Sequence, residues 1–232
     1  MVAAWRRQGE RPYNWAAKGR SPQAAVWKQA LQSEAAAARG QHSASVLVDL
    51  VKAFEMVKLE IVWRQGLRLH FPPGVLRLLM ETFAFARVLM LNGAVAEALH
   101  TLSAILAGSS FATDALYMVL LSPCNELLRE HPQASLCLFV DDLTISAMGT
   151  ITEAAAGVNA AVVHCIELLE GELGLCISRG RQRWRLDPAA KTVGVASSRA
   201  LARRMEPSLR AMGGATRRGA KMLGIDYAAG RR

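Results

Sequence analysis

Apolar and polar positions alternate along the chain in a way that predicts strands separated by helices. Residues 45–50 form a short, β-branched apolar run that ends at an acid, which is typical of a buried strand. Residues 135–140 predict a second buried strand, and residues 143–146 return as its partner. A fourth strand is expected at residues 192–196. The pattern therefore predicts a mixed fold with one central sheet.

Longer stretches with helical periodicity lie around these strands. They are residues 24–39, 53–69, 75–85, 111–130 and 152–173. The first follows Ser21-Pro22, a pair typical of a helix start, and ends at Gly40. Residues 1–20 show no clean period, so we expect them to be irregular.

Two short motifs mark turns between these elements. Pro72-Pro73-Gly74 ends one helix and begins the next. Asn92-Gly93 lies in the middle of residues 87–99 and predicts a hairpin, because both residues tolerate the positive φ of a tight turn. The segment 222–225 predicts one more short extended piece near the C-terminus.

Three acids lie where predicted strands end. Asp49 closes the first strand, and Asp141 and Asp142 occupy the turn of the later strand pair. An isolated Asp-Asp pair is most often an ordinary turn. Here apolar strands flank the pair on both sides, so all three carboxylates can meet at one edge of the sheet. Such a cluster repels itself unless cations neutralise it, and Mg²⁺ prefers oxygen ligands.

The charge of the chain is unevenly distributed. The formal net charge is +9, yet residues 1–175 hold 14 Lys and Arg against 16 Asp and Glu. Residues 176–232 hold 14 Lys and Arg against only 3 Asp and Glu. A solvated basic face explains such a segment as well as a phosphate backbone does.

The cysteines and the apolar stretches exclude several classes. The 4 cysteines are widely spaced and contain no C-x-x-C pair, so neither a zinc site nor a disulfide framework is indicated. No apolar stretch is expected to cross a bilayer, and the basic N-terminus lacks the apolar centre of a signal peptide. We therefore expect an intracellular protein without a membrane partner; nucleus and cytoplasm are not distinguished.

Two motifs resemble the reverse-transcriptase family, particularly its non-LTR retroelement branch. Residues 48–54, Val-Asp-Leu-Val-Lys-Ala-Phe, are similar to the first palm motif, in which Asp binds metal and an aromatic lies beneath the incoming sugar. Residues 139–142, Phe-Val-Asp-Asp, are similar to the aromatic-x-Asp-Asp motif. The resemblance implies that Asp49, Asp141 and Asp142 are catalytic metal ligands and that Phe54 binds the nucleotide as a gate against a 2′-hydroxyl.

Weaker motifs follow in the order of the same family. Ala107-Gly108 stands where Gln-Gly precedes a template-contacting helix, so Gly108 is expected to approach the nucleotide closely. Residues 173–178, followed by Lys191, resemble a fourth motif whose lysine lies near the nucleotide phosphates. Residues 221–225 resemble the primer-grip hairpin, with Lys221 and Gly224. Basic residues suited to the template–primer backbone are Arg179, Arg181, Arg183, Arg185, Arg203, Arg204, Arg217 and Arg218.

The resemblance implies an α+β polymerase palm, an antiparallel sheet with helices packed on one face, with partial fingers and no thumb. Residues 1–44 are expected to be an N-terminal extension with part of the fingers. Residues 45–197 are expected to form the palm, with a fingers insert at about 70–106. Residues 198–232 are expected to form a basic segment with the primer-grip-like hairpin.

The implied activity is that of an RNA-directed DNA polymerase that uses Mg²⁺ or Mn²⁺. Its partners would be an RNA template, a DNA or RNA primer and deoxynucleotides. Ala107 in place of Gln, Glu55 in place of Asp and the insertion at 179–190 depart from the family pattern. A degenerate, non-catalytic nucleic-acid-binding module is therefore the alternative, and another palm-type nucleotidyl enzyme is a third reading. Whether the chain is active without a thumb and full fingers, its template and its oligomeric state stay open.

Overall fold

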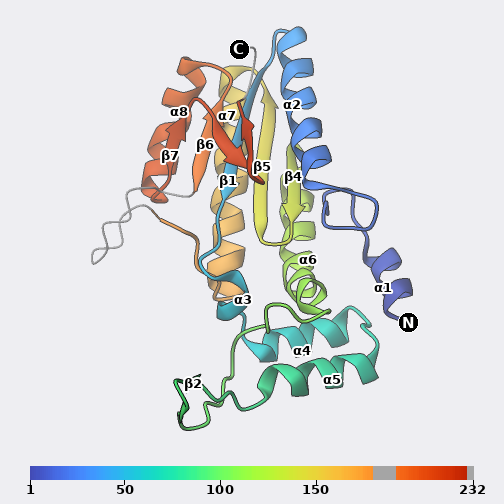
Figure 1. The fold of residues 1–232 in the computed structure, drawn as a ribbon. Coiled ribbons are helices and arrows are strands. Elements are labelled where there is room, and N and C mark those ends of the chain that lie inside the picture. Colours follow the sequence, from blue (N-terminus) through green and yellow to red (C-terminus); the bar gives the residue numbers. More distant parts are fainter. Residues whose placement is uncertain (180–191, 229–232) are drawn as a thin grey trace.

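A five-stranded sheet forms the centre of the molecule (Figure 1). The computed structural model describes residues 1–179 and 192–228. The strands, in spatial order, are β4 (Ala134–Phe139), β5 (Asp142–Gly149), β1 (His42–Val48), β6 (Val193–Ala196) and β7 (Ala215–Arg217). Neighbours are antiparallel except β6 and β7, which run parallel. All four predicted strands are present, with ends shifted by a few residues.

The main apolar core covers one face of this sheet. Alternate residues of β1 and β5 point to that face, and the paired Val46 and Ile145 are fully buried there. Helices α6 (Ala112–Glu130), α7 (Ile151–Ile166) and α8 (Arg199–Ala211) pack on it. A capping box starts α7. The Thr150 hydroxyl accepts a hydrogen bond from the backbone N–H of Glu153, and the Glu153 carboxylate accepts one from the backbone N–H of Thr150.

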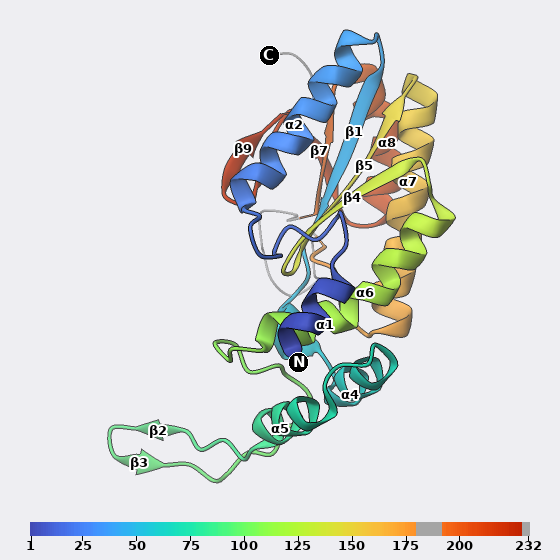
Figure 2. The same ribbon diagram turned by 90° about the vertical axis from the view of Figure 1, so that its right-hand side faces the viewer.

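Helix α2 (Pro22–Ala38) and a two-stranded hairpin, β8 (Ala220–Met222) with β9 (Ile225–Tyr227), lie on the opposite face (Figure 2). Ser21 caps α2 as its position before Pro22 predicts. The side of α2 that faces the sheet is built from small residues, including Ala25, Ser33 and Ala36, all buried. These small side chains let α2 pack closely on this second face of the sheet. The sequence analysis expected helices on one face only, so the position of α2 was not predicted.

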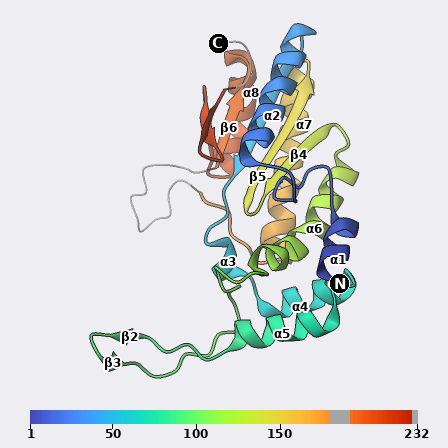
Figure 3. The ribbon, with the colours of Figure 1, turned by 45° about the vertical axis from the view of Figure 1, so that its right-hand side comes forward.

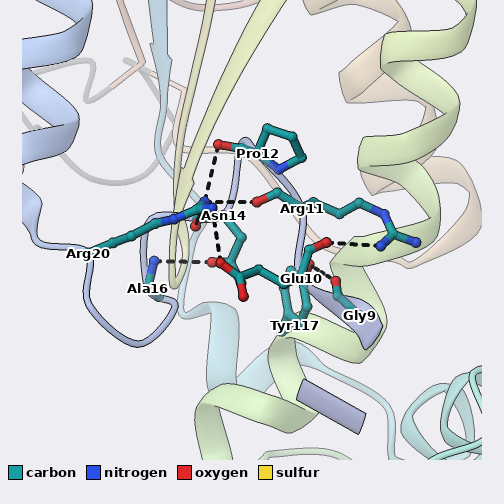
Figure 4. Close-up of polar contacts among 8 residues, drawn as sticks. All are labelled: Gly9, Glu10, Arg11, Pro12, Asn14, Ala16, Arg20 and Tyr117. Carbon is teal, nitrogen blue, oxygen red and sulfur yellow. Dashed lines mark hydrogen bonds and ion pairs between the residues drawn. The ribbon is translucent and has the colours of Figure 1, made fainter. Parts of the chain in front are cut away.

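The N-terminal residues are ordered, so the prediction that residues 1–20 are irregular is wrong in part. Helix α1 (Val2–Gly9) buries Trp5, whose indole N–H donates to the carbonyl of Leu69 at 2.9 Å. Residues 13–15 then cover the free edge of β4 through backbone hydrogen bonds to Leu138. The Arg20 guanidinium donates to three backbone carbonyls of this segment, and Tyr117 donates to a fourth (Figure 4); these are the carbonyls of Arg11, Pro12, Asn14 and Gly9.

The helix predicted over 53–69 is two helices, α3 (Ala53–Met56) and α4 (Leu59–Arg68). Residues 102–105 pair with the intervening backbone: Ile105 N–H donates to the Phe54 carbonyl at 2.7 Å, and Ala104 N–H to that of Val57 at 2.9 Å. These tertiary hydrogen bonds take the carbonyls that a continuous helix would have used, so the helix breaks.

The elements that follow form a lobe below the sheet. Helix α5 (Pro73–Ala84) follows the Pro-Pro-Gly break, and the hairpin of β2 (Met90–Leu91) and β3 (Ala94–Val95) extends away from the body (Figure 3). Its turn is the predicted Asn92-Gly93, with φ of 51° and 83°. Both positive values match the tight turn that this pair favours, which confirms the hairpin.

The apolar content of α7 requires a correction to the membrane expectation. Together with the following π-helical turn η1 (Glu167–Glu172), α7 forms a helix of 22 residues that is long and apolar enough to cross a membrane by length and composition alone. Apolar positions such as Val158 and Val162 are fully buried against the sheet and neighbouring helices, whereas Val163 is 40% exposed. A core helix of a soluble protein has the same features, so the property is weak support for a membrane span.

Helix α8 was not predicted, although the sequence contains its signal. Leu201, Met205 and Leu209 recur every four residues and are fully buried, while Arg203 and Arg204 are exposed. The segment is rich in basic residues, and its amphipathic pattern with one apolar stripe was therefore not recognised as a helix. The predicted α+β architecture is otherwise confirmed, because a largely antiparallel sheet packs against helices.

Candidate active site

The predicted carboxylates meet at one end of β1 and β5. Val48 lies opposite Leu143 in the antiparallel register, so the next residues along these strands, Asp49 and Asp142, are neighbours. Asp141 lies in the two-residue turn between β4 and β5, which the pair Phe139 and Asp142 closes. The structure therefore brings Asp49 beside Asp141 and Asp142, which lie more than 90 positions later in the sequence.

The turn that holds Asp141 has an unusual backbone. Its first residue, Val140, has a φ of 60°. A β-branched side chain in this left-handed region is disfavoured, and such conformations cost on the order of 1–3 kcal/mol. The surrounding strands therefore impose the conformation of the residue that precedes the acids.

The carboxylates influence one another electrostatically. Desolvation raises the pKa of Asp142 from 3.8 to about 6, and the negative charges of Asp141 and Asp49 add to the effect. Asp142 as a whole residue is exposed. The desolvation therefore reflects crowding of its carboxyl group by neighbouring groups and not a position in the core. Like charges held this close favour a bound cation.

A cavity of about 350 Å³ opens beside these acids. Asp49 and Asp142 line it, and so do Arg217 of β7 and Lys221 of β8. Both cations are exposed. The cavity lining thus carries both acids and bases, which suits a ligand that bears phosphates and a metal ion.

Comparison with known proteins gives a fold and no closer relationship. No protein-family model and no curated protein matches the chain. A solved structure of apo telomerase from Candida tropicalis, truncated from the C-terminal domain, is similar over 98% of this chain and 42% of its own, with a TM-score of 0.60 and 10% identity. Telomerase from Candida albicans in complex with a TWJ fragment of telomeric RNA is similar over 97% of this chain and 35% of its own, with a TM-score of 0.52 and 8% identity.

Telomerase is related to reverse transcriptases. The chain has a reverse-transcriptase-like fold. At these identities the likeness concerns the fold alone, and the chain spans less than half the length of either neighbour. The central sheet is accordingly the palm, and the acidic cavity lies at its edge.

The predicted primer-grip segment of the palm is a hairpin. Met222 pairs with Ile225 across a two-residue turn, in which Leu223 and Gly224 have φ of 51° and 79°. Gly224 tolerates this conformation, and Lys221 precedes the turn on β8. Arg218 is exposed in the connection from β7 and does not line the cavity.

The predicted fourth motif also joins the edge of the palm. The N–H of Ser178 donates to the Asp49 carbonyl, and the N–H of Val51 donates to the Cys176 carbonyl, each at 2.8 Å. Residues 176–178 thus extend the sheet beside Asp49. Arg179 forms an ion pair with Glu170 at 2.5 Å. Lys191, Arg181, Arg183 and Arg185 lie outside the described residues.

Phe54 and Gly108 do not line the acidic cavity. Phe54 lies on α3, partly buried against the main core. Gly108 is exposed with a φ of 89°, and an added Cβ would meet open space. That φ explains why glycine occupies the position. The nucleotide-binding roles of both residues stay predictions.

The carboxylate oxygens at the edge of the palm are ligands of the type that Mg²⁺ prefers. All three are carboxylates, and Mg²⁺ needs only one or two of them when waters and substrate phosphates complete its shell. Within residues 1–179 and 192–228, no group of three His, Cys, Asp or Glu side chains has a metal-binding arrangement. The carboxylates therefore share an edge without converging on one point.

Two features of the site region had no sequence signal. A second cavity of about 690 Å³ lies between the N-terminal segment and α6, with Val140 in its wall and Arg7 and Lys18 among its lining residues. The polar contacts of Tyr227 on β9 with the second face of the palm were also missed. Both depend on which elements pack together, and periodicity does not report that.

Proposed function

We propose that the chain is the palm of an RNA-directed DNA polymerase of the non-LTR retroelement type. It would extend a primer 3′-hydroxyl with deoxynucleotides on an RNA template. The observation that carries the proposal is that the register of β1 and β5 makes Asp49 and Asp142 neighbours, next to Asp141, in the lining of a cavity that Arg217 and Lys221 also line. The motif resemblance supports the retroelement branch, and the fold supports the polymerase class.

The carboxylates have distinct roles in this proposal. Asp49, Asp141 and Asp142 would hold Mg²⁺, which when bound lowers the pKa of the primer hydroxyl and stabilises the in-line phosphoryl transfer. Mn²⁺ has similar ligand preferences. Arg217 and Lys221 would bind backbone phosphates across the cavity and hold the primer end against the acids. Phe54 would exclude a ribose 2′-hydroxyl, Gly108 would allow close approach of the nucleotide, and Lys191 would contact its phosphates.

A second candidate is a non-catalytic nucleic-acid-binding module with the same fold. The observation that favours it is that, across the described part of the chain, the acids form no metal-binding group of three. The exposed Arg217 and Lys221 would then bind a duplex without any contribution from Asp141. The two candidates differ in whether that acid matters.

Primer extension on an RNA template with Mg²⁺ and deoxynucleotides tests the proposal. Asp141→Asn removes one charge at the turn, and Glu130→Gln, at an exposed position at the end of α6, is the matched control. We expect Asp141→Asn to lower extension by about a thousandfold at matched duplex binding, because the preorganised charge is lost. The control should extend at the wild-type rate.

The other outcomes separate the candidates. Extension that survives in Asp141→Asn would contradict the metal-ligand role. Extension by no variant, with duplex binding intact and steeply dependent on salt in all of them, would support the binding module. Incorporation of ribonucleotides as readily as deoxynucleotides would remove the role given to Phe54.

A further inference from the structure

The two faces of the palm sheet differ in chemistry. On the second face, β1 presents Ser43 and Ser45, and Ser146 of β5 lies opposite Ser45. All three are buried. Buried hydroxyls need hydrogen-bond partners. Contacts on this face therefore depend on hydrogen-bond direction, unlike the contacts of an aliphatic face.

These hydroxyls form a connected seam beneath α2. Gln29 Nε2 donates to Ser45 Oγ at 3.1 Å, and Ser33 Oγ lies 2.6 Å from Ser43 Oγ. The seam continues to the hairpin, because Ser45 Oγ lies 3.1 Å from Tyr227 Oη. One serine thus joins α2, β1 and β9.

Tyr227 is well suited to anchor this hairpin. Its side chain is 3% exposed, and burial raises the pKa of its hydroxyl above the usual value, so the group is protonated. Its ring packs with Met222, Val195 and Val26 in a small apolar cluster beside the seam. The Tyr227 hydroxyl links the hairpin to the rest of the palm, through Ser45 of β1 and through Gln29 and Ser33 of α2.

The anchor matters because the hairpin is a separate two-stranded sheet. It is not paired with the five-stranded sheet, and isolated hairpins of this size are marginally stable in water. Lys221 lies on β8 of the same hairpin and lines the cavity that Asp142 also lines. The position of that cation therefore depends on how firmly β9 is held.

We propose that Tyr227, through Ser45, is a positioning residue that holds the β8–β9 hairpin so that Lys221 lines the same cavity as Asp49 and Asp142. This inference rests on the proposed function where it concerns the primer. Tyr227 is not among the residues that line the cavity, so it acts through the hairpin. The Tyr227 ring packs the hairpin against the palm, and the Tyr227 hydroxyl sets the orientation of the hairpin.

Tyr227→Phe tests the hydroxyl alone, because the ring and its packing remain. Ser135→Ala is the matched control, since it deletes a hydroxyl of the same face that lies 2.7 Å from Ser146 Oγ and has no link to the hairpin. We expect amide hydrogen exchange over residues 220–227 to quicken about three- to tenfold in Tyr227→Phe and to stay unchanged in the control. The dissociation constant for a primer–template duplex should rise by a similar factor, with the KM for the nucleotide unchanged.

Ser45→Ala approaches the same hydrogen bond from the other side. The double variant Tyr227→Phe, Ser45→Ala should speed exchange at the hairpin by less than the two single effects combined, because both variants remove the contact between Ser45 Oγ and Tyr227 Oη. Unchanged hairpin exchange in Tyr227→Phe, or equal loosening in Ser135→Ala, would overturn the inference. If the wild type fails to extend a primer while the hairpin and duplex effects appear, the polymerase proposal fails and the positioning role stands.

Discussion

Strand β5 passes through two environments: its middle stabilises the fold, and its start destabilises it. In the middle, Ile145 lies opposite Val46 of β1, and both are fully buried in the main core. At the start, Asp142 lies next to Asp49, and the two carboxylates repel each other. The same register creates both pairs. The strand that stabilises the palm therefore also forces like charges together at its edge, a cost expected of a functional site.

The largest effect is expected in the middle of the strand. Ile145→Ala should lower the free energy of unfolding by about 3 kcal/mol, because it deletes buried methylene and methyl groups and leaves a cavity. Urea denaturation followed by circular dichroism measures this. A loss below about 1 kcal/mol would show that the core relaxes around the gap and that the contrast with the edge is weak.

The acidic end should respond in the opposite direction. Asp142→Asn should raise the free energy of unfolding by about 1 kcal/mol at pH 7.5 without divalent cations, a figure reduced for solvent screening at this exposed residue. The folded protein holds the Asp142 proton up to a pKa of about 6 against 3.8 ordinarily, so the wild type loses stability as pH rises from about 4 to 6. The advantage of the variant should therefore vanish below pH 4.

Urea titrations of both proteins from pH 3.5 to 7.5 provide the measurement. Glu130→Gln is again the control, because its carboxyl is exposed at the end of α6 and lies outside the cavity. An advantage of Asp142→Asn that is the same at every pH would mean that repulsion among the three acids is not its cause.

The smallest effect is expected for a hydroxyl on the second face of the same strand. Ser146→Ala should lower the free energy of unfolding by about 0.5–1 kcal/mol, because it removes the hydrogen bond to Ser135. Denaturation under the conditions used for Ile145→Ala gives the comparison. A loss as large as that of Ile145→Ala would mean that the polar seam, rather than the aliphatic face, holds the sheet together.

Much of the fold was predictable because local patterns agree with the tertiary structure. Apolar runs marked the strands, Ser21-Pro22 marked the start of α2, and Asn92-Gly93 marked a hairpin turn that needs two positive φ values. Helix α1 was missed, because Trp5 is held by the distant Leu69 carbonyl rather than by a local period. The break after α3 was missed for the same reason, since residues 102–105 impose it.

The candidate site was predictable in its acids and less so in its surroundings. Asp49, Asp141 and Asp142 follow apolar runs, and strand ends are where a sheet presents side chains to a ligand. Tyr227 and Ser45 carried no such signal, because a serine or tyrosine in the sequence does not reveal which hydroxyl lies opposite it. Phe54 and Gly108 were placed by resemblance, and the structure puts them away from the acidic cavity.

The sequence by itself determined four of the five strands of the central sheet, most of the helices, and the three acids at strand ends, because these depend on periodicity and on the conformational preferences of single residues. Tertiary structure alone decided that β1 pairs with β5 in the register that joins Asp49 to Asp142. It also decided that α2 covers the second face and that Tyr227 reaches Ser45. Such contacts link residues up to 182 positions apart, and only the packing of whole elements selects them.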